Sequence, residues 1–224
     1  MVRIKIRVLL VLLSATELLF AQTGGTIHGT VVDQSGNTVP GATLYVQPEG
    51  PMGMPLPQCA TDEQGSCSIS QLTLGPYFIY ASKPAEGYPD QAYSFFLPRG
   101  TKPMEAILSE DHPFDAVVVH LGVKAGVLKG TVADAVLGKP LDAIVEFRWV
   151  SDPQNFLSGS GLTNAQFRIL VPSDTRLKMV VSLDGYQNWV YGVDGSTLGK
   201  VLFLHPGQEE ILDIRLKPKP PLTQ

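Results

Sequence analysis

Charge is sparse and nearly balanced in this sequence. Its 224 residues hold 17 Lys and Arg against 21 Asp and Glu, so the formal net charge is only −4. No run of basic residues occurs beyond the N-terminal segment. Proteins that bind nucleic acids carry a basic patch or stripe. We therefore predict no nucleic-acid partner for this chain.

Histidine is also scarce, and the motifs of common catalytic sites are missing. A zinc carboxypeptidase requires a His-x-x-Glu pair and a distant histidine. His112-Pro-Phe-Asp115 ends in the wrong carboxylate, and the spacing from His205 to Glu209 is wrong. The sequence has no Gly-x-Ser-x-Gly elbow. We predict no catalytic residue, no metal ligand and no cofactor.

Long apolar runs are missing except at the N-terminus. Basic residues at the start precede an almost wholly apolar stretch, Val8–Phe20, which ends before Ala21. This order is typical of a secretory signal peptide, although Glu17 interrupts the run. The stretch is shorter than the ~20 residues that span a bilayer, which disfavours the alternative of an uncleaved anchor. We predict cleavage after Ala21 and a mature protein in the periplasm or outside the cell, with no transmembrane span.

The rest of the chain contains one pattern twice. Residues 27–33 read Ile-His-Gly-Thr-Val-Val-Asp, residues 128–134 read Leu-Lys-Gly-Thr-Val-Ala-Asp, and a glycine follows each. Further matching segments along the chain are separated by nearly the same number of residues as these two segments are. A constant spacing between matches indicates tandem units. We predict two domains, 22–121 and 125–217, and a Pro-rich tail over 218–224.

Within each copy, apolar and polar residues alternate with a period of two, which is the pattern of a half-buried strand. In the first matching segment Ile27 and Val31 share one face, and Lys129 marks the outward face in the second. Turns rich in glycine, proline and aspartate separate about seven such runs in each copy. Only residues 103–108 suggest a short helical turn. The predicted fold class is all-β, with two tandem antiparallel β-sandwiches.

The order of the turn motifs resembles the carboxypeptidase regulatory-like domain, a transthyretin-like (prealbumin-like) β-sandwich. The matching residues of the first copy are Gly29, Val31, Asp33, Gly36, Pro40, Gly41, Ala42, Thr61, Asp62, Gly65, Leu72, Gly75, Tyr77, Gly87 and Tyr88. The second copy keeps fewer of them and has Asn164-Ala-Gln166 where the turn glycine belongs. The resemblance implies a binding, spacer or accessory module without activity of its own. Its partner would be an unidentified protein or glycan of the cell envelope.

The two cysteines flank the turn at Thr61–Gly65. If Cys59 and Cys67 face each other across a hairpin, their side chains leave the same face of neighbouring strands. Exported proteins mature in an oxidising compartment, so we predict a disulfide between them. The alternative is that Cys67 is a buried apolar filler of the core.

Three aromatic residues are candidates for stacking on a sugar. Tyr93 in the first copy, and Trp189 and Tyr191 in the second, follow the Gly-Tyr turn. At a period of two, half of the rings in these segments enter the core instead, and Trp149 is predicted to be a core residue. The primary interpretation is an exported non-catalytic module. The alternatives are a carbohydrate-binding protein and, less favoured, a small transthyretin-like hydrolase.

Overall fold

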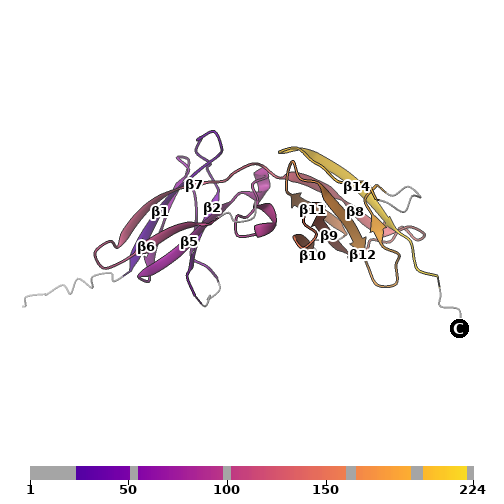
Figure 1. Ribbon diagram of the computed structural model, residues 1–224, viewed down its shortest axis with the longest axis horizontal. Coiled ribbons are helices and arrows are strands. Elements are labelled where there is room, and N and C mark those ends of the chain that lie inside the picture. Colours follow the sequence, from indigo (N-terminus) through magenta and orange to yellow (C-terminus); the bar gives the residue numbers. More distant parts are fainter. Residues whose placement is uncertain (1–23, 51–54, 98–101, 160–164, 193–198, 221–224) are drawn as a thin grey trace, which may run out of the picture.

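The protein consists of two β-sandwiches that lie end to end (Figure 1). The computed structural model describes residues 24–50, 55–97, 102–159, 165–192 and 199–220. The predicted signal peptide, residues 1–21, lies outside the described residues, as does most of the predicted tail.

Seven strands form the first sandwich. They are β1 (Gly25–Val32), β2 (Thr43–Pro48), β3 (Gln58–Ala60), β4 (Ser66–Leu72), β5 (Gly75–Ser82), β6 (Met104–Leu108) and β7 (Phe114–His120). A three-stranded sheet in the order β4-β1-β7 packs on a four-stranded sheet in the order β3-β2-β5-β6. Alternate residues of the strands, such as Ile27, Leu44 and Ile79, point inwards and are almost completely buried.

The second sandwich repeats this plan with seven more strands. They are β8 (Gly126–Asp134), β9 (Ile144–Trp149), β10 (Phe156–Gly159), β11 (Gln166–Val171), β12 (Leu177–Ser182), β13 (Trp189–Val190) and β14 (Glu209–Leu216). The sheets have the orders β11-β8-β14 and β10-β9-β12-β13, which match those of the first sandwich strand for strand. Leu128, Phe147 and Met179 lie in its core. The predicted all-β sandwich fold is confirmed, and the domain limits stay a prediction.

Two features differ from the predictions made from the sequence. The pairs β1 with β7 and β8 with β14 are parallel. Each joins the first and last strand of a sandwich, and the chain reaches the last strand by crossing over from the other sheet rather than by a hairpin. Residues 103–108 are not a helical turn, because Met104–Leu108 pairs with β5 as a strand.

An aspartate closes the turn after the first strand of each sandwich. The Asp33 carboxylate accepts hydrogen bonds from the backbone N–H groups of Ser35 and Asn37, and a further one from the Asn37 side chain. Asp134 does the same for the N–H groups of Val136 and Leu137. These bonds stabilise the charged form and lower the pKa of both carboxyls. The aspartate of the repeated Gly-x-Val-x-Asp motif therefore closes the turn that follows the first strand of each sandwich.

Asp134 has an additional donor, which leads to a prediction of pH dependence. The Tyr186 hydroxyl donates to Asp134 Oδ2 at 2.8 Å and contributes to its lowered pKa. A carboxyl whose pKa is lower in the folded state stabilises the fold above its unfolded pKa, and this stability is lost as the pH falls through the folded pKa. We expect Tyr186→Phe to destabilise the second sandwich most at neutral pH, with the difference from wild type shrinking below about pH 4.

The measurement is urea unfolding at a series of pH values. The control is Tyr88→Phe, at the equivalent position of the first sandwich. Asp33 accepts its hydrogen bonds from Ser35 and Asn37, so we expect this variant to show no such pH dependence. A Tyr186→Phe effect that does not change with pH would contradict the role given to this hydroxyl.

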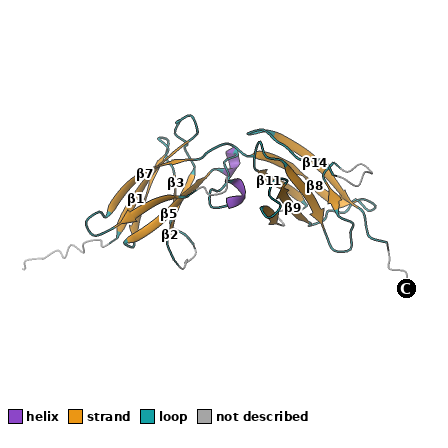
Figure 2. Cartoon of the chain, in the orientation of Figure 1, coloured by secondary structure: helices purple, strands orange, loops and turns teal. Residues whose placement is uncertain are grey.

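The segment between β5 and β6 belongs to the first sandwich in the chain order but also contacts the second sandwich. We call residues 84–97 the strap; it contains two 3₁₀ turns, η1 (Pro84–Glu86) and η2 (Ser94–Phe96), which lie between the sandwiches in Figure 2. The strap carbonyls of Pro84 and Ala85 accept hydrogen bonds from Arg168 of β11. Phe95 is only 3% exposed and belongs to the core of the second sandwich. A residue within the predicted first domain thus completes the core of the second.

Candidate functional site

A cavity lies at the junction of the two sandwiches. Its volume is about 590 Å³, within the range typical of small-ligand sites, which are frequent at domain interfaces. The strap supplies one wall, the linker between the sandwiches a second, and the loops of the second sandwich the rest. The lining residues are Pro89, Phe96, Val123, Ala125, Trp149, Ser151, Asp152, Pro172, Ser173 and Thr175. The walls are mainly apolar, with a few hydroxyl groups and one carboxylate.

Trp149 has a different role from the core position predicted for it. It is only half-buried, at the end of β9, and lines the junction cavity. The strand ends there, so the inward face of this residue meets the strap instead of the opposite sheet. Its ring packs edge to face on Phe95, with 6.4 Å between ring centroids. The indole Nε1–H is buried and finds no acceptor among the described residues.

The three predicted stacking residues do not come together in one place. Trp189 and Tyr191 are neighbours, with ring centroids 6.4 Å apart, and both are half-buried against the core of the second sandwich. Tyr191 donates to Glu210 Oε1 at 2.8 Å, and burial together with this bond raises the pKa of the phenol to about 12. Tyr93 is 58% exposed and belongs to the strap, where its N–H bonds the Asp90 carbonyl. Sequence spacing alone could not separate these two environments.

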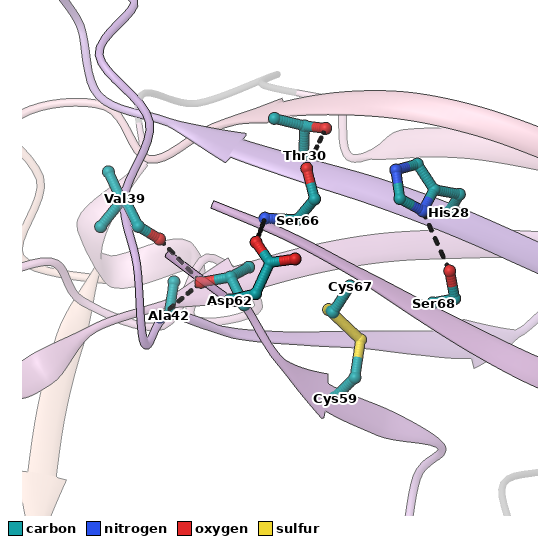
Figure 3. Close-up of a disulfide and its surroundings, with 10 residues drawn as sticks. His28, Thr30, Val39, Ala42, Cys59, Asp62, Ser66, Cys67 and Ser68 are labelled. Atoms are coloured by element: carbon teal, nitrogen blue, oxygen red, sulfur yellow. Dashed lines mark hydrogen bonds between the residues drawn. A yellow bond between two sulfur atoms is a disulfide. The ribbon is translucent and has the colours of Figure 1, made fainter. Parts of the chain in front are cut away.

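The predicted disulfide between Cys59 and Cys67 is confirmed, with 6.1 Å between the Cα atoms (Figure 3). The expected hairpin is wrong, because Cys59 lies on β3 of the four-stranded sheet and Cys67 on β4 of the three-stranded sheet. The turn between them carries the chain from one sheet to the other, held by Thr61 Oγ1, which donates to the Val39 carbonyl and accepts from the Ala42 N–H. The bond therefore ties the two layers of the first sandwich together.

Removal of this bond is expected to weaken the first sandwich alone. The cysteines are 8 positions apart in the chain, and closing so small a loop stabilises a fold by roughly 2 to 3 kcal/mol in the chain-entropy model. We expect the double variant Cys59→Ser, Cys67→Ser to lose about that much in the first sandwich, seen as faster hydrogen exchange of β3 and β4. Exchange in the second sandwich, which has no cysteine, should not change; equal acceleration in both would contradict a local role.

The outer face of the first three-stranded sheet carries no Asp, Glu, Lys or Arg side chain along β1 and β4. Side chains pair across these two strands in three successive rows, two of which are drawn in Figure 3. The pairs are Thr26 with Ser70 at 3.2 Å, His28 with Ser68 at 2.9 Å, and Thr30 with Ser66 at 2.8 Å. The corresponding face of the second sandwich carries ion pairs instead, Lys129 with Glu209 and Arg215 with Asp213. The same fold thus presents two chemically different surfaces.

Among the described residues, no group of three or more His, Cys, Asp or Glu side chains is placed to hold a metal ion. His28 and His205, for example, lie on different sandwiches and bond Ser68 and Asp174 respectively. No helix in the described part of the chain is long and apolar enough to cross a membrane.

Comparison with known proteins yields only distant structural likeness. No protein-family model and no curated protein matches the chain. The Bacillus anthracis TIE protein is 14% identical with a TM-score of 0.33, over 88% of this chain and 34% of that chain. A streptococcal ancillary pilin is 13% identical with a TM-score of 0.36, over 89% of this chain and 64% of that one.

The shaft pilin SpaA from Lactobacillus rhamnosus GG is 11% identical with a TM-score of 0.35, over 90% of this chain and 100% of its own. This chain therefore spans about a third of the first of these proteins and less than two thirds of the second. TM-scores this low carry no argument about function, and the fold assignment rests on the strand order and the buried cores.

Proposed function

We propose that this chain is an exported, non-catalytic module of the carboxypeptidase regulatory-like type. In this proposal residues 1–21 are a cleaved signal peptide, and residues 22–121 and 125–217 are two tandem transthyretin-like domains. The module binds or spaces other components of the cell envelope or the extracellular space. The observation that carries the proposal is the disulfide between Cys59 and Cys67, the only cysteines of the chain.

Two further features support this proposal. Disulfides persist in oxidising compartments and are rare in the cytosol, which agrees with the signal-like start of the sequence. The residues that repeat between the sandwiches serve backbone turns, as Asp33 and Asp134 do. Such residues specify a fold, and the function of a protein with that fold depends on other residues, those of its binding sites.

The test is the state of the protein in the cell that makes it. We expect the intact mass of the purified protein to correspond to a chain that begins at Gln22. This mass should be lower by two hydrogens than the mass of the reduced form. A fusion of residues 1–30 to a reporter that is active only after export should be active, and deletion of residues 8–20 should abolish this activity. Free thiols on both cysteines, or an inactive fusion, would overturn the proposal.

A second candidate function is carbohydrate binding through Trp189, Tyr191 and Tyr93. It is supported by the partial exposure of the first two rings side by side and by the exposed ring of Tyr93. The double variant Trp189→Ala, Tyr191→Ala should then lose retention on a polysaccharide gel, and Tyr93→Ala should reduce it. Unchanged retention in a folded double variant would exclude these residues.

A further inference from the structure

We infer that β14 is the interface of a dimer, in which its open edge pairs antiparallel with β14 of a second copy of this chain. The inference goes beyond the proposed function, because neither export nor the disulfide requires self-association. It rests on the unpaired backbone groups of β14, on the blocked edge of the equivalent strand β7, and on the order of charges along β14.

One edge of β14 carries backbone groups that no described residue pairs with. β14 is the last strand of its sheet and lies beside β8 (Figure 1). The bond from Ala135 N–H to the Leu216 carbonyl shows that the even-numbered residues of β14 direct their backbone groups to β8. The residues between them direct theirs to the other side. The N–H and C=O groups of residues 209, 211, 213 and 215 therefore lie at an open edge.

The equivalent strand of the first sandwich, β7, has a blocked edge. By the same alternation, its even-numbered residues direct their backbone groups away from β1. The Ala116 N–H at this edge donates to Asp115 Oδ1 at 2.8 Å, and the His120 carbonyl accepts from the side-chain amide of Gln91 in the strap. Proteins protect edge strands from other chains by covering them in this way. In the described part of the second sandwich, β14 has no such bonds at its edge.

The charges along β14 match the strand to a second copy of itself. The side chains of the edge residues Glu209, Ile211, Asp213 and Arg215 are all exposed. Edge residues must face edge residues, so an antiparallel pair is centred on a residue of the strand. With the centre at Leu212, Glu209 of each copy lies opposite Arg215 of the other.

Other registers of the pair bring like charges together. A centre at Ile211 places Glu209 opposite Asp213, and a centre at Asp213 places two Asp213 side chains opposite each other. Opposite charges across a strand pair are stabilising, and like charges directly opposite are destabilising. The order of charges therefore selects the register centred on Leu212.

Glu209 and Arg215 already form ion pairs within the chain but keep atoms for this contact. Lys129 Nζ binds Oε2 of Glu209 at 2.7 Å, and Arg215 uses Nε and Nη2 for Asp213. This leaves Oε1 of Glu209 and Nη1 of Arg215 without a partner among the residues described. Pairing would join two three-stranded sheets into one continuous sheet. Because both copies use the same surface, the contact is isologous and the assembly closes as a dimer.

The first experiment measures the molecular mass of the purified protein by sedimentation equilibrium up to about 1 mM, where even weak complexes form. We expect a monomer–dimer equilibrium for the wild type. Ile211→Pro should weaken the dimer at least about ten-fold, because it removes an N–H of the open edge without removing a bond to β8. Val118→Pro, which removes an edge N–H of β7, is the matched control and should leave the equilibrium unchanged.

The second experiment tests the register with charge variants. Two copies of Arg215→Glu place acidic side chains opposite each other, and two copies of Glu209→Arg place basic ones opposite each other. Each variant alone should therefore dimerise at least about ten-fold more weakly than the wild type. An equimolar mixture of the two should form a heterodimer with nearly wild-type affinity, because acidic side chains then lie opposite basic ones throughout. Native mass spectrometry distinguishes the heterodimer by its mass.

Several outcomes would overturn the inference. A wild type that stays monomeric over this concentration range does so, and it leaves an extended segment of another protein as the remaining partner of the edge. Dimers that persist in Ile211→Pro, or that dissociate equally in Val118→Pro, show that the edge of β14 is not the interface.

Failure of the mixed charge variants to associate overturns the pairing centred on Leu212, on which the inference depends. These variants change only exposed side chains, so they test the interface even if Ile211→Pro unfolds β14. Every one of these results leaves the export test unaffected.

Discussion

Replacement of Phe95 by alanine is expected to destabilise the second sandwich by about 3 to 5 kcal/mol, the usual cost of removing a buried phenylalanine side chain. Phe95 lies in the strap, before β6 of the first sandwich, yet its ring is buried in the second core and packs on Trp149. The variant leaves a cavity where the strap enters this core. The connection between the two sandwiches should also loosen, because Phe95 is one of the strap's contacts with the second sandwich, beside Phe96 and the hydrogen bonds from Arg168.

The chain offers a direct readout for this prediction. Its two tryptophans, Trp149 and Trp189, both belong to the second sandwich, so fluorescence-detected urea unfolding reports on that sandwich. Tyr93→Ala, an exposed position of the same strap, is the control and should shift the midpoint little. If Phe95→Ala left the fluorescence transition unchanged and weakened only the first sandwich, the assignment of this ring to the second core would be wrong.

The second large effect is expected at Gly130, in the middle of β8. A Cβ atom placed there would lie 2.0 Å from the backbone carbonyl oxygen of Leu212, on the paired strand β14, and 2.8 Å from the Phe167 ring. A backbone carbonyl within a strand pair cannot rotate away. We expect Gly130→Ala to cost about 3 kcal/mol, the upper end of the usual overpacking range, and to loosen the pairing of β8 with β14.

The repeat supplies the matched control, Gly29→Ala. A Cβ atom at Gly29 would meet the Cδ1 atom of Leu44 at 2.3 Å, and the end of a leucine side chain can shift by a change of rotamer. This variant should cost about 1 kcal/mol. Hydrogen exchange resolved by peptide measures both effects, since each falls in a different sandwich. Equal costs at the two glycines would show that the close contact with Leu212 does not limit the fold.

The same glycine is thus required for different reasons in the two copies. In the first sandwich it makes room for a core side chain, and in the second for a neighbouring backbone. The two copies also differ at the turn glycine that precedes the fourth strand of each sandwich. Gly65 has a φ of 74°, and Ala165, which occupies the equivalent position, has a φ of 60°. Both carbonyls accept a hydrogen bond from the first strand of their sandwich, through the N–H groups of Val31 and Val132, so the bond is kept although the glycine is not.

The local part of this structure was determined by the sequence alone. Alternation with a period of two, as in Ile27 to Val31, buries one side of each strand, and the repeated turns after Asp33 and Asp134 set where strands end; both depend on neighbouring residues. The signal-like start of the sequence, together with the short spacing of Cys59 and Cys67, also led to the prediction of their bond.

Only the tertiary structure decided which distant segments meet. It placed the two cysteines on opposite sheets, paired the first and last strands in parallel, and brought Phe95 into the second core. It also showed that Trp149, which was predicted to be a core residue, lines a cavity. The physical reason is that period and turn chemistry specify which face of a strand is buried, but not which other element covers that face.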